Sequence, residues 1–186
     1  IKTGLRYTYH QLQPNIIYGT NGEETFTSKV ETKFGHENEI YVLDDWKIRR
    51  QLSLNMGVRL SNFIQTGPYT DEATQKKYNT NDIVTSYIVP EPRITFNKGI
   101  NEQSSIKGGV SLSSQYLHLV SNSGSTLPTD IWVPSTKKVK PQIGIQYAIG
   151  YYINLFNDQV ETSVETYYKD LRNQLDYRES YVESFS

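Results

Sequence analysis

Apolar and polar residues alternate strictly over long stretches of this chain. The clearest stretch is 142–156, QIGIQYAIGYYINLF, where every odd position from Ile143 to Leu155 is apolar or aromatic. Its even positions from Gln142 to Asn154 carry glycine, alanine, amides and one tyrosine. Because successive side chains of a β-strand point to opposite faces of its sheet, this period of two predicts a strand with one apolar and one polar face.

The same pattern predicts strands along most of the chain. It is regular in 1–9, 51–61, 106–116 and 160–169, and less regular in 39–48, where Asp44 interrupts an apolar face, and in 87–97. We predict no helix and seven strands, over residues 1–12, 39–48, 50–64, 87–97, 104–118, 142–156 and 159–177. Phe26, Val30 and Phe34 recur at even positions, so residues 13–37 can hold an additional strand pair.

The lengths of strands and links narrow the architecture. Soluble strands average about 5–6 residues and tilted membrane-spanning strands about 9–11, and the alternating runs here reach about 10–14. Short links (47–50, 98–103 and 157–158) alternate with long ones (13–38, 65–86 and 119–141). This arrangement favours an all-β antiparallel meander that is a fragment of a transmembrane β-barrel. Two alternatives stay open: a soluble β-sandwich or small-barrel ligand-binding module, and a closed outer-membrane enzyme or adhesin of about eight strands.

The composition of the polar face favours the membrane barrel. A solvated exterior is normally rich in Lys and Glu, whereas these positions hold mainly small, uncharged residues. Trp46 near a short turn and Tyr7, Tyr9 and Tyr116 near long links fit the two aromatic girdles of such a barrel. The prolines at 90 and 92 both lack an N–H group on the same side of their strand, so we expect strand pairing to fail there.

Composition argues against several classes of function. The net charge of −1 gives no basic field for nucleic acid, and the absence of Cys excludes thiolate chemistry. The three His residues are scattered without metal-ligand spacing, and the adjacent Asp44 and Asp45 would point to opposite faces of a strand. The longest mostly apolar run, 147–156, is too short for a spanning helix. We therefore predict no enzyme activity, no metal and no cofactor.

Three stretches resemble the barrel of TonB-dependent outer-membrane receptors. The first contains EPRITF (91–96) and QYLHLVSNSGSTLPTDIWVPSTKKVKPQ (115–142) and ends in the strand at 142–156. The second, ETYYKDLRNQLDY (165–177), is similar to a family strand, and YVLDDWKI (41–48) is similar to the hairpin that contains D-x-W. The order and spacing of the three match the family, and the resemblance covers about residues 38–178.

The resemblance implies a barrel of about 22 strands in the outer membrane, plugged by an N-terminal domain and energised by TonB for uptake of scarce nutrients. The implied partners are outer-membrane lipid, the plug, TonB, and a small-molecule, glycan or peptide ligand. This sequence shows neither plug nor TonB box and has too few strands for such a barrel. We therefore expect an internal barrel fragment that starts in a strand and stops in an extracellular loop.

Candidate ligand contacts lie on the predicted polar face and in the long links. They are Arg59, Arg93, Lys107, Glu161, Glu165 and Trp132. The alternative is that the charged residues contact a plug or lumen water and that Trp132 packs within its loop. Gly108 and Gly109 are expected to leave room for a plug or to bend their strand.

Overall fold

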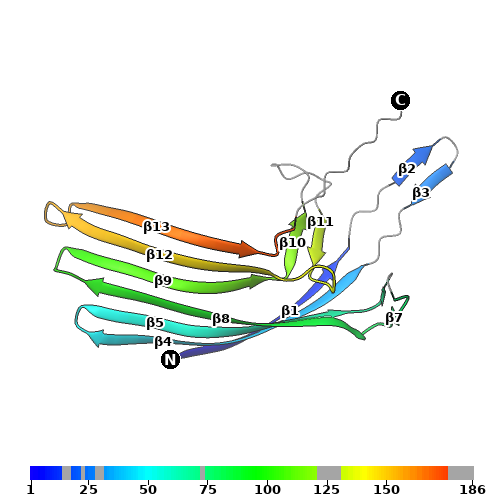
Figure 1. The fold of residues 1–186 in the computed structure, drawn as a ribbon, viewed down its shortest axis with the longest axis horizontal. Coiled ribbons are helices and arrows are strands. Elements are labelled where there is room, and N and C mark those ends of the chain that lie inside the picture. Colours follow the sequence, from blue (N-terminus) through cyan, green and yellow to red (C-terminus); the bar gives the residue numbers. More distant parts are fainter. Residues whose placement is uncertain (14–17, 22–23, 28–31, 72–73, 121–130, 176–186) are drawn as a thin grey trace.

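A single antiparallel sheet dominates the computed structural model, which describes residues 1–13, 18–21, 24–27, 32–71, 74–120 and 131–175. The sheet has seven strands in the order β1-β4-β5-β8-β9-β12-β13 (Figure 1). Their bounds are β1 Lys2–Leu12, β4 Lys33–Arg49, β5 Leu52–Thr66, β8 Ile83–Gly99, β9 Ser104–Gln115, β12 Gln142–Leu155 and β13 Val160–Arg172. Each strand pairs with the next long strand along the chain, which confirms the predicted all-β antiparallel meander.

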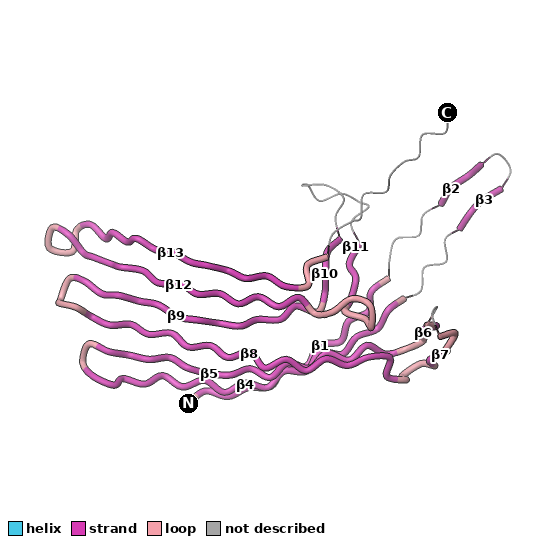
Figure 2. Tube along the Cα trace, viewed as in Figure 1, coloured by secondary structure: helices cyan, strands magenta, loops and turns pink. Residues whose placement is uncertain are grey.

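Three two-stranded ribbons lie in the long links, all at one end of the sheet (Figure 2). They are β2 (Tyr18–Asn21) with β3 (Glu24–Thr27), β6 (Tyr69–Thr70) with β7 (Lys77–Tyr78), and β10 (Leu117–Val120) with β11 (Ile131–Pro134). Residues 13–37 thus hold a strand pair, although Val30 lies outside the described residues. No helix in the described ranges has the length and apolarity needed to span a membrane.

Four strand ends differ from the prediction by three residues or more. β4 begins at Lys33 and β8 at Ile83, earlier than residues 39 and 87, while β9 stops at Gln115 and β13 at Arg172. The first residues of β4 and β8 include polar side chains such as Asn38 and Ser86 among apolar ones. This mixture weakens the alternation of apolar and polar residues on which the prediction rests. There the strands pair through their main chains, as in the run from His10↔Gly35 to Tyr7↔Asn38. Residues 176 and 177 lie outside the described part.

The strand register separates the sheet into two faces, because directly opposite residues of an antiparallel pair share a face. One row of the apolar face runs from Met56 through Ile94, Val110 and Tyr147 to Tyr168. In β4 this face is apolar or aromatic from Ile40 to Ile48, with Asp44 between, a span of about nine residues. At about 3.4 Å per residue and a tilt near 40°, that span gives an apolar band roughly 23 Å tall, close to the height of about 25 Å that is usual in outer-membrane barrels.

Asp44 interrupts the apolar face at a polar contact. Its carboxylate accepts a hydrogen bond from the indole N–H of Trp46, two positions nearer the turn on the same face. Trp46 itself is half-exposed, as are Tyr7 and Tyr9 near the other end of the sheet. These three rings therefore stand at the two margins of the apolar band, where the sequence places aromatic girdles.

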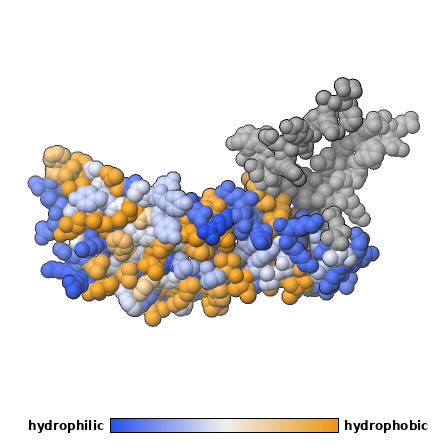
Figure 3. Space-filling model, viewed as in Figure 1, coloured by the Kyte–Doolittle hydropathy of each residue, from blue (hydrophilic) through white to orange (hydrophobic). Residues whose placement is uncertain are grey.

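No second layer covers the apolar face in the described residues. The only buried apolar side chains that they contain, apart from proline, are Phe63, Val84 and Tyr116, whereas most large apolar residues of the strands are substantially exposed. In Figure 3 apolar surface runs along the lower margin of the strands, and the end that carries β6 and β7 is hydrophilic. A β-sandwich would bury this face against another sheet, so the soluble β-sandwich alternative does not fit.

Pairing between β8 and β9 stops part-way. The register runs from Gly99↔Ser105 to Arg93↔Ser111 and ends there, although both strands continue. On its other edge β8 pairs with β5 straight through Leu60↔Pro90 and Val58↔Pro92. The missing proline N–H groups therefore face β9, which confirms the predicted local failure of pairing, and β8 and β9 diverge beyond this point (Figure 1).

The two adjacent glycines of β9 accommodate close neighbours from β8. A Cβ atom at Gly108 would lie 2.8 Å from the ring of Phe96, directly opposite on the apolar face. A Cβ atom at Gly109 would lie 2.6 Å from the carbonyl oxygen of Ile94. The space left by the missing side chains of these two glycines is therefore filled by atoms of β8.

Candidate functional site

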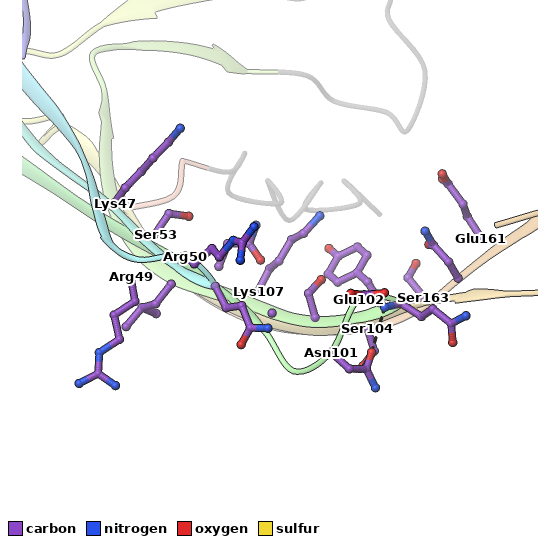
Figure 4. Close-up of a pocket in the computed structure, with 18 of the residues that line it drawn as sticks. Lys47, Arg49, Arg50, Ser53, Asn101, Glu102, Ser104, Lys107, Glu161 and Ser163 are labelled. Carbon is purple, nitrogen blue, oxygen red and sulfur yellow. Dashed lines mark hydrogen bonds between the residues drawn. The ribbon is translucent and has the colours of Figure 1, made fainter. Parts of the chain in front are cut away.

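The polar face of the sheet is concave, and charged side chains from several strands project over it. Figure 4 shows Lys47, Arg50, Lys107 and Glu161 on the concave side near the short turns, with Arg49 directed the opposite way. The hollow that they line has a volume of about 1160 Å³. Within it the ammonium group of Lys107 lies 4.1 Å from the centre of the Tyr152 ring, a cation–π contact.

Farther from the turns, a row of ion pairs crosses four adjacent strands. Arg6 of β1 contacts Glu39 of β4 with both Nε and Nη2, at 2.6 and 2.7 Å. Arg59 of β5 lies 3.5 Å from Glu39 and donates from Nε to Glu91 of β8 at 2.8 Å. The two glutamates are only 7% and 4% exposed, so each carboxylate is both desolvated and paired. Such charges hold their geometry because unpairing them is costly.

The row continues toward β9 through neutral hydroxyl groups. Ser61 donates to Oε1 of Glu91 at 2.8 Å, and its oxygen lies 3.1 Å from Ser114 and 2.7 Å from the hydroxyl of Tyr116. The Tyr116 ring stacks on Phe63 with 5.1 Å between centroids and 10° between planes. Tyr116 is 2% exposed and faces inward. Its assignment to an aromatic girdle was therefore wrong, because the chain turns inward where β9 has lost its partner.

The β10–β11 hairpin rests on this inward turn. Ser135 donates its main-chain N–H to the carbonyl oxygen of Tyr116 at 2.7 Å, and His118 Nε2 lies 3.1 Å from the Ser135 hydroxyl. Tyr87 of β8 donates its hydroxyl to the carbonyl oxygen of Thr136 at 2.7 Å. Trp132 is half-exposed opposite Leu119 on the hairpin.

A second contact ties the hairpin to the loop between β5 and β8. Lys137 donates to the hydroxyl of Tyr78 at 2.6 Å and lies 3.6 Å from Asp71. The hydrogen bond from Lys137 lowers the pKa of the Tyr78 phenol, and the same bond raises the pKa of Lys137. The two long links therefore meet through a charged contact outside the seven long strands.

Acidification is expected to loosen the hairpin at His118. Burial lowers the pKa of its imidazole below the usual 6.5, so the unfolded hairpin binds the proton more readily than the folded one. His118 therefore contributes stability that is complete above pH 6.5 and is lost as the pH falls toward the lowered pKa. We expect amide exchange in residues 117–120 to accelerate several-fold from pH 7.5 to 5.5, after correction for intrinsic rates.

A His118→Gln variant provides the control, because glutamine retains a polar partner for Ser135 but does not titrate. Its corrected exchange rate should change little over the same pH range. An equally large acceleration in this variant would show that another group carries the effect.

Five of the six candidate contacts from the sequence lie on the concave face. Arg59 belongs to the ion-pair row, Lys107 and Glu161 line the hollow beside the turns, and Arg93, Lys107 and Glu165 line an adjacent hollow of about 520 Å³. Trp132 is separate, on the hairpin. The sequence analysis did not select Glu39 and Glu91. The feature that could have identified them is an acidic residue on the polar face of a predicted strand.

No group of three or more His, Cys, Asp or Glu residues in the described ranges is arranged to hold a metal. The concave face instead offers fixed charges, hydroxyls and aromatic rings around open hollows. Such a surface can bind and orient a polar solute that passes over it.

Comparison with known proteins places most of the chain in a described family. A family model described as an outer membrane beta barrel domain matches residues 13–154 of the 186. A search of curated proteins gives no match. The matched part contains five of the seven long strands, together with their alternating faces. The chain belongs to the outer membrane β-barrel domain family, and its apolar face lies against the lipid of the outer membrane.

Proposed function

We propose that this chain is part of the barrel of a TonB-dependent receptor, which takes up a scarce nutrient through the outer membrane. The observation that carries the proposal is the open arc of the sheet. β1 and β13 are edge strands within the described residues, and the seven strands curve gently (Figure 1). In an eight-stranded barrel, by contrast, only one additional strand would separate β1 from β13, so seven strands would form a nearly closed ring. The side chains of such a barrel would fill its interior.

The hollows on the concave face favour a wide barrel that has room for other molecules inside. The two hollows, of about 1160 and 520 Å³, are open and lined mainly by polar and charged residues. A narrow barrel fills its interior with side chains, whereas a wide one leaves room for a plug and a solute. Segments that resemble the receptor family also fall on long strands in the family's order: 41–48 in β4, 91–96 in β8 and 165–172 in β13.

The function proposed for the concave face is transport without catalysis. Charges on the lumen wall would meet the plug and the nutrient, and the loops would capture the ligand. The partners in this proposal are a plug, TonB, and a small-molecule, glycan or peptide ligand, and the charged candidates for ligand contact are Arg59, Arg93, Lys107, Glu161 and Glu165.

Uptake by cells that carry or lack the full-length gene tests the proposal. Ferric chelate, haem, cobalamin, a glycan and a peptide would each be supplied as the limiting source, with and without a protonophore. We expect deletion of the gene to lower the uptake of one of these nutrients at least tenfold. Collapse of the proton gradient by the protonophore should lower the uptake of the same nutrient equally in cells that carry the gene. Folded protein in the outer membrane, measured by heat-modifiable gel mobility, serves as the expression control.

Two results would contradict the proposal. The first is uptake that survives the protonophore, which indicates passive diffusion through an open pore. The second is an unchanged uptake of all five nutrients together with open-pore conductance of the full-length protein in planar bilayers.

A further inference from the structure

The upper part of β9 is attached to the wall on one edge only. Its pairing with β8 ends at Arg93↔Ser111, whereas its pairing with β12 continues to Gln115↔Gln142. Between β8 and β9 the outer half of the wall therefore lacks a main-chain ladder. Among the described residues, only side chains join the two strands across this gap. Within the described wall, β8 and β9 can therefore separate here while breaking the fewest backbone hydrogen bonds.

We define the seam contacts as the interactions of Ser114 and Tyr116 with Ser61, Glu91 and Phe63. They comprise the hydroxyl contacts Ser61–Ser114 at 3.1 Å and Ser61–Tyr116 at 2.7 Å, the Ser114–Glu91 hydrogen bond, and the ring stack on Phe63. All the wall-side partners belong to β5 or β8. Breaking these contacts separates the end of β9 from β5 and β8 without disturbing the ladder between those two strands, and β9 stays paired with β12.

Release of the seam would leave no unpaired charge behind. Glu91 is the one ionised group among the seam contacts, and Arg59 holds its Oε2 while Ser61 donates to its Oε1. Both partners stay with β5 when Ser114 and Tyr116 leave. The groups that lose a partner are hydroxyls and Oε1 of Glu91, which loses Ser114 but keeps Ser61, and water in the lumen can replace these hydrogen bonds. A buried ion pair that split would instead be strongly resisted.

The hairpin is tied to the freed end of β9. The Ser135 N–H bonds to the carbonyl oxygen of Tyr116, and His118 contacts the Ser135 side chain, so the base of the hairpin moves with Tyr116. β11 also contacts β1, which is separated from β9 in the sheet by β4, β5 and β8. The hairpin therefore extends across the concave side at the loop end of the strands (Figure 1).

We propose that the end of β9 and the β10–β11 hairpin form a gate that narrows the outer mouth of the barrel and opens when the seam contacts release. Two outer contacts, Tyr87–Thr136 and Lys137–Tyr78, complete the closed position. The gate does not depend on the proposed transport function, because it follows from strand pairing and applies to any solute that enters the barrel.

Spin-label distances in the full-length protein, reconstituted in liposomes, test the gate. Labels at Leu119→Cys on the hairpin and Thr8→Cys on β1 report their separation, and the present chain contributes no native Cys. We expect a dominant short distance and a minor longer one. Ser114→Ala and Tyr116→Phe each remove hydroxyl contacts from the seam, and Tyr116→Phe keeps the stacked ring. Each variant should raise the fraction of molecules with the longer distance about fivefold.

A disulfide across the seam gives the opposite change. Ser61→Cys with Ser114→Cys replaces two hydroxyls that are 3.1 Å apart, and oxidation should slow amide exchange in residues 131–136 at least tenfold. The control is Ile94→Cys with Val110→Cys, a directly opposite pair on β8 and β9 where the main-chain ladder between these strands persists. Its oxidation should leave that exchange unchanged.

A single distance that neither substitution alters would overturn the gate. So would an oxidised seam that exchanges as fast as the reduced one. If Tyr116→Phe does not fold, Ser114→Ala decides the distance measurement by itself, because it leaves the stacked rings intact.

Discussion

Replacement of Ile149 by arginine is expected to destabilise the folded protein by about 2–4 kcal/mol, the cost of an arginine near the middle of a bilayer on the lipid face of a barrel. Ile149 lies near the middle of β12, opposite Gly108 on one side and Thr166 on the other. It is 52% exposed on the apolar face, with no described protein layer over it. The cost therefore comes from lipid rather than from a packed core.

The adjacent residue supplies the control. Ala148 precedes Ile149 in the same strand and lies on the concave face, opposite Gly109 and Tyr167. Ala148→Arg should cost less than about 1 kcal/mol, because lumen water solvates the added charge. Urea-dependent unfolding of the full-length protein in phospholipid vesicles, followed by tryptophan fluorescence, measures both. Equal costs at the two positions would contradict the assignment of the faces.

The second large effect is expected at Arg59. Arg59→Met removes the guanidinium between Glu39 and Glu91, and Glu91 is then a nearly buried carboxylate with only hydroxyl partners. We expect a loss of about 3 kcal/mol, at the lower end for a broken buried pair because the Arg59 side chain is 36% exposed. Glu39 contributes less to this loss, since Arg6 remains bound to it.

Removing the unpaired charge should restore most of the stability. The double variant Arg59→Met with Glu91→Gln is expected to recover more than half of the lost free energy of unfolding, because an amide needs no ionic partner. Arg93→Met is the matched control: Arg93 lies on the same face one strand away, and no ion pair joins it to the described residues. A double variant as unstable as Arg59→Met alone would show that Glu91 is not the source of the loss.

The sequence predicts the strands of this protein well because each of them faces two different environments. In 52–60 every even position is apolar, and the structure places all of these residues on the lipid side. The prolines at 90 and 92 predict the side on which β8 loses its partner, since a missing N–H group is a local property. Where a strand runs beyond the lipid, as in 33–38, the polar residues erase the alternation and the start of the strand is missed.

Contacts across the sheet are much harder to predict. Arg59 and Glu91 are 32 positions apart, and they meet only because the register aligns them as direct partners. The inward position of Tyr116 depends on the lost pairing of β9, on Phe63 and on Ser61, so neighbouring residues in the sequence carry no sign of it. The ion-pair row and the seam therefore follow from strand register, which alternation alone does not specify.

Lipid contact along β12 tests the central claim most directly. Single cysteines at each position from 143 to 155 of the full-length protein would carry a fluorescent label, in vesicles that contain lipids brominated on their acyl chains. We predict strong quenching at the odd positions, from Ile143 through Ile149 to Leu155, and weak quenching at the even ones, such as Gln146 and Ala148. Quenching without this alternation, or strongest at the even positions, would contradict a barrel wall with lipid on one face and the lumen on the other.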